Sequence, residues 1–182
     1  EIRELDQTIS TYKSLNDTNA GKALSETVDN LYKQAGMTTI SGPGIILNVR
    51  PSAESVAFGV PITGISPDLL TRFVNELNQF KGISLEIDGK RFTTLSSIRD
   101  INGVTSVNGL NISTPPFTMK IISPTMEDSE KLYNFLSAST IRDDFYLDNL
   151  LLVIGKPEVN IEIRGYKERF ENQFLKEIPK GE

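Results

Sequence analysis

The chain has 182 residues, 38% of them hydrophobic and 24% charged, which is typical of a globular protein that can bury a sizeable core. It contains no Cys and no His, which excludes disulfide bonds, thiolate metal sites, Ser-His-Asp triads and Cys-His dyads within this sequence. The net charge of -5 argues against nucleic-acid binding, because phosphate contacts need clustered basic charge. No apolar run approaches the ~20 residues that a membrane-spanning helix requires. Because residue 1 is Glu instead of Met, we expect a segment upstream of it.

Residues 1–36 are rich in helix-forming side chains and contain no Pro. Two apolar series with helical spacing run along this segment, on either side of an interruption at residues 16–21. The first is Ile2, Leu5, Ile9 and Tyr12, and the second is Leu24, Val28, Leu31 and Ala35. We predict a helix that breaks near Gly21, resumes and ends at Gly36. Two interpretations are open: an amphipathic helix packed on its own domain, or a dimerising coiled-coil stalk with the first series at the interface.

The globular part is predicted to begin with a strand and a helix. Residues 41–44 (Ser-Gly-Pro-Gly) predict a turn, and residues 45–49 predict a buried strand. The two glycines precede the strand and no Gly-Lys-Ser/Thr follows, so a nucleotide-binding loop is not indicated. After a loop at residues 51–64, Ser66 is placed to cap a helix that starts at Pro67 and closes at Gly82. The core-facing stripe of this helix is Leu69, Leu70, Phe73, Val74, Leu77 and Phe80.

Residues 83–87 predict a strand, which is followed by three dipeptides that favour tight type I′ hairpin turns. These are Asp88-Gly89, Asn102-Gly103 and Asn108-Gly109. The β-compatible runs around them are residues 91–94, 98–101, 104–107 and 110–112. The region therefore predicts a meander of short antiparallel strands, which ends at residues 114–116 and precedes a strand at residues 117–122.

Two helices and a strand complete the prediction. Thr125 and Asp128 resemble a capping box, and the buried face of the helix that they begin is Met126, Leu132, Tyr133 and Leu136. A third helical piece is predicted over residues 145–154, and an alternating strand over residues 158–164.

Without the meander, the predicted order is strand, helix, strand, strand, helix, strand. This order is typical of an α+β fold with a ferredoxin-like split β-α-β core, here with an inserted β-hairpin meander and a preceding N-terminal helix. We predict three parts, namely an N-terminal helical stalk (1–37), an α+β globular domain (38–166) and a charged C-terminal tail (167–182).

The stretch most like a site is residues 86–109, where basic and hydroxyl side chains gather on the predicted hairpins. Arg91 and Arg99, with Ser97 and Lys90, are suited to holding a phosphate or carboxylate group. The alternative is that these side chains simply face solvent. A Ser-Lys dyad of Ser96 or Ser97 with Lys90 is a third interpretation, although hairpin spacing does not by itself place a base beside a nucleophile.

The acidic clusters are interpreted as structural. Carboxylates at residues 127, 128 and 130 complement the dipole of a predicted helix. Asp143, Asp144 and Asp148 lack the spacing of a calcium loop and indicate a solvated face. Asn75 and Glu76 have no spacing diagnostic of catalysis. We therefore predict no metal site, no cofactor and no catalytic residue.

Several stretches, taken in order, resemble the domain of unknown function 881 family of bacterial proteins. They are the Ser-Gly-Pro-Gly strand at residues 41–44, the helix segment at 74–77, the hairpin at 88–91, the Ser-Ser-Ile-Arg strand at 96–99 and the Asn-Gly turn at 108–109. The match covers nearly everything after residue 31. Where the family pattern has Asn and Gln, this sequence has Asp88 and Lys90, and Asp-Gly serves the turn equally well.

The resemblance implies a single-pass protein of the bacterial cell membrane, with an N-terminal anchor, a coiled-coil stretch and this domain outside the cytoplasm. Such proteins are often encoded beside division and envelope genes, and no enzymatic activity comes with the resemblance. The expected partners are a second copy, joined through the N-terminal helix, and other envelope or division proteins. The membrane would be reached only through a segment absent from this sequence.

Three hypotheses for the function follow. The first is a non-enzymatic, extracytoplasmic interaction or scaffold domain. The second is a ligand-binding sensory domain for an anionic envelope molecule. The third is an unrecognised Ser or carboxylate hydrolase.

Overall fold

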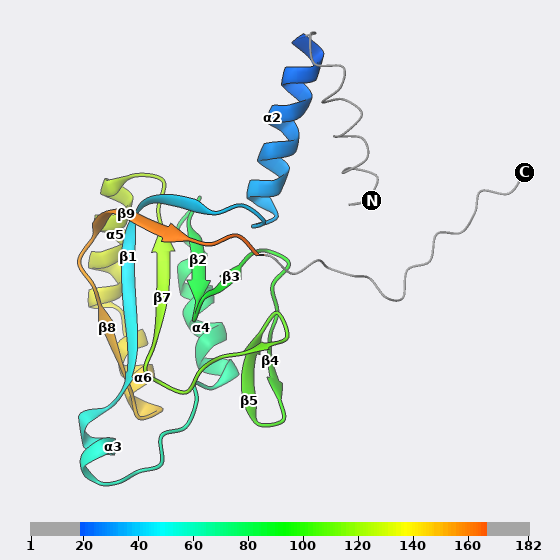
Figure 1. Ribbon diagram of the computed structural model, residues 1–182. Helices are drawn as coiled ribbons and strands as arrows, with labels where there is room; N and C mark the ends of the chain where they lie inside the picture. The colour runs from blue at the N-terminus through cyan, green and yellow to red at the C-terminus, as the bar shows by residue number, and fades with distance from the viewer. Residues whose placement is uncertain (1–18, 167–182) are drawn as a thin grey trace, which may run out of the picture.

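The computed structural model describes residues 19–166, which form two antiparallel sheets and five helices (Figure 1). The helices are α2 (Asn19–Gln34), α3 (Ala53–Ala57), α4 (Pro67–Leu77), α5 (Met126–Ala138) and α6 (Ile141–Leu147). The larger sheet contains β1 (Ile40–Pro51), β2 (Ser84–Ile87), β3 (Lys90–Phe92), β7 (Phe117–Ile122), β8 (Leu150–Ile154) and β9 (Glu158–Ile163). The smaller contains β4 (Ile98–Ile101), β5 (Val104–Val107) and β6 (Leu110–Asn111). The predicted α+β class is confirmed.

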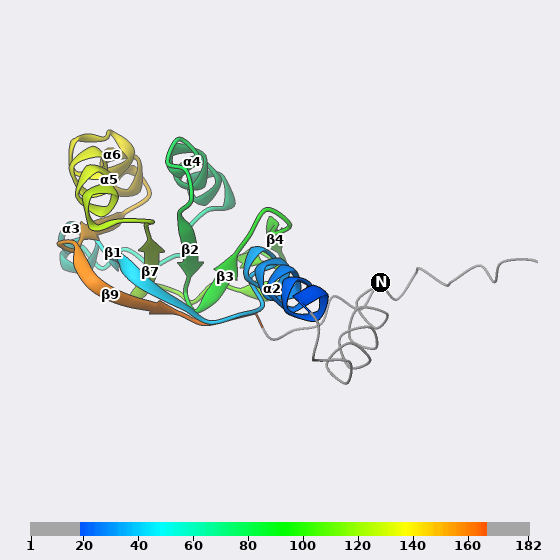
Figure 2. The same cartoon turned by 90° about the horizontal axis from the view of Figure 1, so that it is seen from above.

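The long strand β1 organises the larger sheet, whose strand order is β3-β2-β7-β1-β8. On the side away from β7, β1 pairs with β9 along its first part and with β8 along its last part. Helices α4, α5 and α6 cover one face of the sheet, while β9 and the beginning of β1 run along the other (Figure 2). Helix α2 projects from one end of the domain (Figure 1). Helix α3 and the segment after it, residues 53–64, are called the α3 loop and lie at the opposite end.

The main core lies between the sheet and α4, α5 and α6. The inward side chains of β1 (Ile45, Leu47 and Val49) are fully buried. The predicted stripe of α4 is buried from Leu69 to Leu77, and Phe80, beyond the helix end, packs partly buried against the same core. The rings of Phe73 and Phe145 meet edge to face with centroids 6.0 Å apart, which joins α4 to α6. A second, smaller cluster around Ile122, Ile161 and Ile163 closes the opposite face.

Local sequence signals are confirmed where capping and turn chemistry set them. The backbone N–H of Leu69 donates to Ser66 Oγ at 3.2 Å, and that of Asp128 donates to Thr125 Oγ1 at 3.1 Å, so both predicted N-caps form. All three predicted hairpin dipeptides have positive φ at both residues, as type I′ turns require. Strands β4, β5 and β7 have the predicted bounds.

The predicted turn at residues 41–44 is wrong, because these residues belong to β1. They pair with β9, and the register shifts between Gly42 and Gly44, so the glycines mark a bulge inside a continuous strand. Gly44 also allows β7 to approach closely, since a Cβ atom there would lie 2.0 Å from the backbone oxygen of Ile121. Closely spaced glycines are typical both of a turn and of a bulge, so the sequence alone does not distinguish the two.

The predicted helix at residues 145–154 is also wrong. Helix α6 ends at Leu147, Asn149 adopts a φ of 60° in the turn, and residues 150–154 form β8. A short apolar run does not distinguish a buried strand from a buried helix by its periodicity, and here pairing with β1 decides.

The helix before the domain is partly as predicted. Helix α2 passes through Gly21 without a break, whereas an interruption was predicted at residues 16–21. It closes at Gly36, whose φ of 73° and N–H bond to the Lys33 oxygen form the expected C-terminal cap. The predicted interface residues Ile2, Leu5, Ile9 and Tyr12 lie outside the described residues. The division at residues 37 and 166 stays a prediction.

Candidate functional site

The four residues predicted to bind an anion fall into different environments. Arg91 is buried on β3 of the larger sheet, whereas Arg99 is exposed on β4 of the smaller sheet. Lys90 points its ammonium group at Asp88, with Nζ 2.8 Å from Oδ2 and 2.9 Å from the backbone oxygen of Asp88. Ser97 contributes its backbone, since its N–H donates to Asn108 Oδ1 at 3.3 Å. Within residues 19–166, no hydrogen bond or ion pair joins these four side chains to one another.

The serines near Lys90 serve the loop that carries them. Ser96 Oγ accepts a hydrogen bond from the Thr93 N–H at 2.8 Å, which closes the turn between β3 and β4. Asn108 Nδ2 donates to the Arg91 backbone oxygen at 3.0 Å and so fastens the β5–β6 turn to β3. The ammonium group of Lys90 is paired with Asp88 and not with a serine, so the geometry gives no support to a Ser-Lys dyad.

Arg91 is the most unusual of the four. Its Nη2 donates to Ser84 Oγ at 3.1 Å, while Nε and Nη1 are buried and have no hydrogen-bond partner in the described part of the chain. The turn that ends α2 lies against it, because a Cβ added to Gly36 would lie 3.1 Å from Arg91 Cγ. Burial lowers the pKa of Arg91 below its ordinary value, and the charge of Glu86 opposes this shift.

A row of charged side chains crosses the outer face of the sheet beside Arg91. Glu86 lies opposite Arg91 in the β2–β3 register and opposite Lys120 in the β2–β7 register. Glu86 is buried, and its Oε1 is 3.5 Å from Lys120 Nζ, which also donates to the Glu162 backbone oxygen at 3.0 Å. A buried carboxylate needs such a cation. The contacts of Glu86 and Lys120 therefore tie β2, β7 and β9 together.

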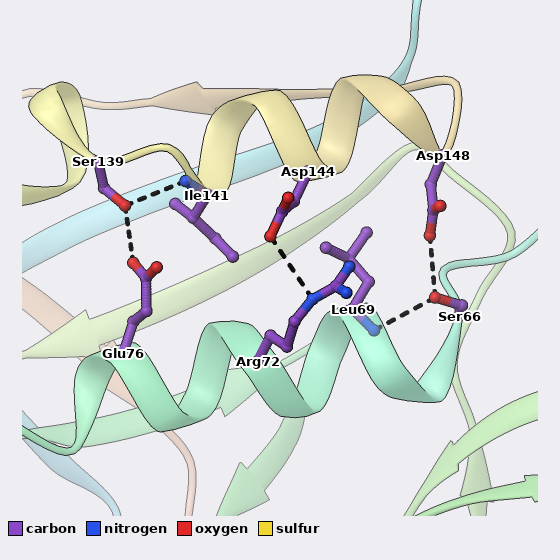
Figure 3. Close-up of polar contacts among 8 residues, drawn as sticks. All are labelled: Ser66, Leu69, Arg72, Glu76, Ser139, Ile141, Asp144 and Asp148. Carbon is purple, nitrogen blue, oxygen red and sulfur yellow. Dashed lines mark hydrogen bonds and ion pairs between the residues drawn. The ribbon is translucent and has the colours of Figure 1, made fainter.

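Sequence reasoning missed a second polar cluster, which lies between α4 and α6 (Figure 3). Ser66 Oγ donates to Asp148 Oδ2 at 2.9 Å, and Arg72 Nε lies 3.5 Å from Asp144 Oδ2. The interpretation of Asp143, Asp144 and Asp148 as a solvated face is therefore corrected for Asp148, which accepts the bond from Ser66, whereas the ion pair of Asp144 is open to solvent. Their partners are 72 and more residues away in sequence, so no local pattern reveals them.

Ser139 lies at the other end of this contact between α4 and α6, which is called the seam below. Its Oγ donates to Glu76 Oε2 at 2.7 Å and accepts from the Ile141 N–H at 3.0 Å (Figure 3). Both bonds fix the start of α6 against α4. A cleft of about 380 Å³ lies beside this point and is lined by Ser137, Ala138, Ser139, Arg142, Asp143, Tyr146, Leu151 and Leu152.

The α3 loop exposes apolar side chains on a fixed base. Val56, Phe58, Val60 and Ile62 are all exposed, and Phe58 keeps 83% of its surface in solvent. At the base, Ser52 Oγ and Ser55 Oγ are 2.6 Å apart, and Ser55 Oγ donates to Asn149 Oδ1 at 3.0 Å. The hydroxyl of Tyr146 donates to the Glu54 carboxylate, and this bond raises the pKa of Tyr146. The tip is thus held out by polar contacts with α6 and the turn after it.

The described residues, 19–166, contain neither a helix that could span a membrane nor a cluster of side chains that could hold a metal ion. None of the helices combines the length and the apolar character needed to cross a bilayer. No three acidic side chains come together in an arrangement that could hold a metal ion.

Comparisons with known proteins place the chain in a family. A family model described as a bacterial protein of unknown function (DUF881) matches residues 27–176. The UPF0749 protein YlxX of Bacillus subtilis (strain 168) is 32% identical over 176 residues, which cover 97% of this chain and 74% of that protein. A crystal structure of an uncharacterized conserved protein from Mycobacterium tuberculosis is similar in fold, with a TM-score of 0.58 and 14% identity over 84% of this chain and 99% of that chain. This chain belongs to the DUF881 family of bacterial proteins of unknown function.

Proposed function

We propose that this chain is a non-enzymatic interaction domain of a membrane-anchored bacterial protein, held outside the cytoplasm. The observation that supports it best is the α3 loop. Phe58 is 83% exposed at its tip, while Ser52 and Ser55 at its base are buried and hydrogen-bonded. An apolar patch that is held in water on a fixed base is typical of a surface that contacts another protein.

The placement of α2 fits a stalk in this proposal. Helix α2 and the α3 loop lie at opposite ends of the domain (Figure 1). With an anchor upstream, the loop would point away from the membrane, toward other envelope or division proteins. The stalk would form a dimer through Ile2, Leu5, Ile9 and Tyr12, which have the spacing of a coiled-coil seam.

The loop is tested in the bacterium with the full-length protein. We expect Phe58→Ser to remove its localisation to the division site or envelope, measured with a fluorescent fusion. The matched control is Leu95→Ser, because Leu95 is 72% exposed on a different loop. If both variants localise as the unchanged protein does, the α3 loop is not the contact surface.

The compartment and the stalk need separate measurements. Alkaline phosphatase is fused to the full-length protein, after the position of residue 182. The fused enzyme should be active, since alkaline phosphatase works only outside the cytoplasm. Sedimentation should show a dimer for the 182-residue chain and a monomer for the same chain with Leu5→Ser and Ile9→Ser. Inactive phosphatase contradicts the proposed topology, and an unchanged sedimentation coefficient contradicts the proposed stalk.

A second candidate function is binding of an anionic ligand at Arg91. It is favoured by the buried Nε and Nη1 atoms that have no partner in the described residues. Such donors match a carboxylate or phosphate oxygen. Calorimetric titration with acetate and with inorganic phosphate tests this, and Arg91→Met should remove any binding while Arg99→Met should not. Absence of heat with both anions rules this candidate out.

We also propose that the larger sheet is a ferredoxin-like split β-α-β core. This is supported by the order β2-β7-β1-β8 and by the helices between β1 and β2 and between β7 and β8. Strand β3, the smaller sheet and β9 are then additions to this core. Nuclear Overhauser contacts between the Cα protons of β1 and β7 and of β1 and β8 would test the central pairing.

A further inference from the structure

Most neighbours of Arg91 are held in place by strand pairing. Its Nη2 donates to Ser84 Oγ on β2, and Glu86 of the same strand lies opposite Arg91 in the register. Its backbone oxygen accepts from Asn108 Nδ2 in the β5–β6 turn. These neighbours cannot move away from Arg91 without disturbing the two sheets.

Gly36 is the neighbour of Arg91 that does not belong to a sheet. It caps α2, and a Cβ atom added to it would lie 3.1 Å from Arg91 Cγ and 3.5 Å from Arg91 Nε. Helix α2 projects away from the domain, so this cap is the point at which the helix meets it (Figure 1). The Gly36 oxygen accepts the Tyr166 N–H at 2.7 Å, beyond the end of β9. The cap of α2 is therefore the part of the Arg91 surroundings that can move with the least loss of contacts.

The arrangement with Gly36 against Arg91, called the closed arrangement below, leaves polar atoms without partners. Arg91 Nε and Nη1 are buried and accept no anion, carbonyl or hydroxyl group of residues 19–166 as a partner. Thr38 Oγ1, two residues after Gly36, is also buried without a partner in this range. Buried donors without partners destabilise the arrangement that buries them. An anion would satisfy Arg91, but it cannot reach Nε while this atom is covered.

We propose that a carboxylate or phosphate group reaches Arg91 only when the end of α2 moves away, so that anion binding and the position of α2 are linked. This inference rests on the second candidate function given above, the binding of an anion at Arg91. A ligand that binds only one of two arrangements shifts the population toward that arrangement. The linkage is reciprocal, so a change that moves the end of α2 away should strengthen anion binding. Occupancy of Arg91 would thus be transmitted to the helix that precedes the domain.

The movement is tested by a distance measurement on the 182-residue chain. The chain has no Cys of its own, so spin labels are placed at Lys33→Cys, exposed in the last turn of α2, and at Leu95→Cys, exposed on the loop after β3. Pulsed electron spin resonance should give a different distance distribution in inorganic phosphate, or in acetate, than without the anion. Arg91→Met should abolish this difference, whereas Arg99→Met should preserve it.

The reciprocal effect is tested by calorimetry with Gly36→Ala. The added methyl group would lie 2.5 Å from Thr93 Cγ2 and 3.1 Å from Arg91 Cγ, and it therefore pushes the end of α2 away. We expect the variant to bind inorganic phosphate or acetate several-fold more tightly than the unchanged chain. Gly103→Ala is the matched control, because this glycine also has a positive φ, of 79°, but nothing lies within 4 Å of an added Cβ. It should leave the affinity unchanged.

The outcomes separate the linkage from the function on which it rests. If an anion binds the unchanged chain and Arg91→Met removes the binding, the second candidate function stands. In that case, an unchanged label distance or an unchanged affinity of Gly36→Ala overturns the linkage alone. If neither anion binds the unchanged chain or Gly36→Ala, the candidate function and the linkage are both wrong.

Discussion

Asp88 and Lys90 form an ion pair across the β2–β3 turn, with 2.8 Å between Oδ2 and Nζ. The same carboxylate oxygen accepts the N–H of Ser113 at 2.8 Å and so ties the end of the meander to this turn. Both side chains are mostly buried. Asp88 therefore joins the β2–β3 turn to the end of the meander through its two partners.

The first prediction concerns this pair and pH. Burial alone would raise the pKa of Asp88, but Lys90 and the Ser113 N–H outweigh it and hold the pKa below its ordinary value of 3.8. The stabilisation is therefore present above the pKa of the unfolded state and is lost as the pH falls through the lower folded-state pKa. Asp88→Asn should lower the free energy of unfolding by about 1–2 kcal/mol at neutral pH. In urea denaturation, this difference should shrink when the pH is brought well below 3.8.

Two further variants complete that experiment. Asp100→Asn is the control, because exposed Asp100 also accepts a turn N–H, that of Gly103, and should show little change. Lys90→Gln added to Asp88→Asn should cost much less than Lys90→Gln alone, since the ion pair is already gone. Additive losses would contradict a direct interaction between Asp88 and Lys90.

The second prediction contrasts the two cations beside Glu86. Lys120→Met removes the ion pair of a buried carboxylate and should cost about 2–4 kcal/mol in free energy of unfolding. Arg91→Met removes a guanidinium group that has two unpartnered buried nitrogens, so its cost should be below about 1 kcal/mol. Guanidinium chloride denaturation measures the free energy of unfolding of both variants. A larger loss of stability for Arg91→Met than for Lys120→Met would show that Arg91, and not Lys120, is the main partner of Glu86.

The third prediction concerns Gly44, at the end of the paired segment of β1 and β7. A methyl group at Gly44 would lie 2.0 Å from the Ile121 backbone oxygen, and neither backbone can move without breaking the ladder. Gly44→Ala should therefore cost about 3 kcal/mol or more, or prevent folding. Gly64→Ala is the matched control, because nothing lies within 4 Å of its added carbon. Equal thermal midpoints for the two variants would show that the strands separate easily at this point.

The fourth prediction concerns the seam between α4 and α6. Ser66 caps α4 and also donates to Asp148, so Ser66→Ala should cost about 1–2 kcal/mol. Arg72→Ala should cost less than about 0.5 kcal/mol, because its pair with Asp144 is exposed to solvent. The unfolding free energies of the two variants, compared in one buffer, decide whether the cap or the ion pair holds the helices.

The sequence predicted best what short-range chemistry controls. The Asp-Gly and Asn-Gly turns and the caps at Ser66 and Thr125 need only neighbouring residues, and the structure has them as predicted. The predictions for residues 41–44 and 150–154 are wrong because the conformation of these residues depends on pairing with residues 99 or more positions away. The burial of Arg91 likewise depends on the end of α2, which no pattern around residue 91 reveals.

Strands β1 and β9 begin and end at the same side of the domain, with Ile40 opposite Ile163 and the Tyr166 N–H bonded to the Gly36 oxygen. A force that pulls residue 36 and residue 166 apart would therefore break the hydrogen bonds between β1 and β9 one after another, starting at the pair of Ile40 and Ile163. The part of β1 between β7 and β8 would instead be loaded along its length, with many bonds sharing the tension. Under mechanical stress, β9 should peel away first and leave the central sheet intact.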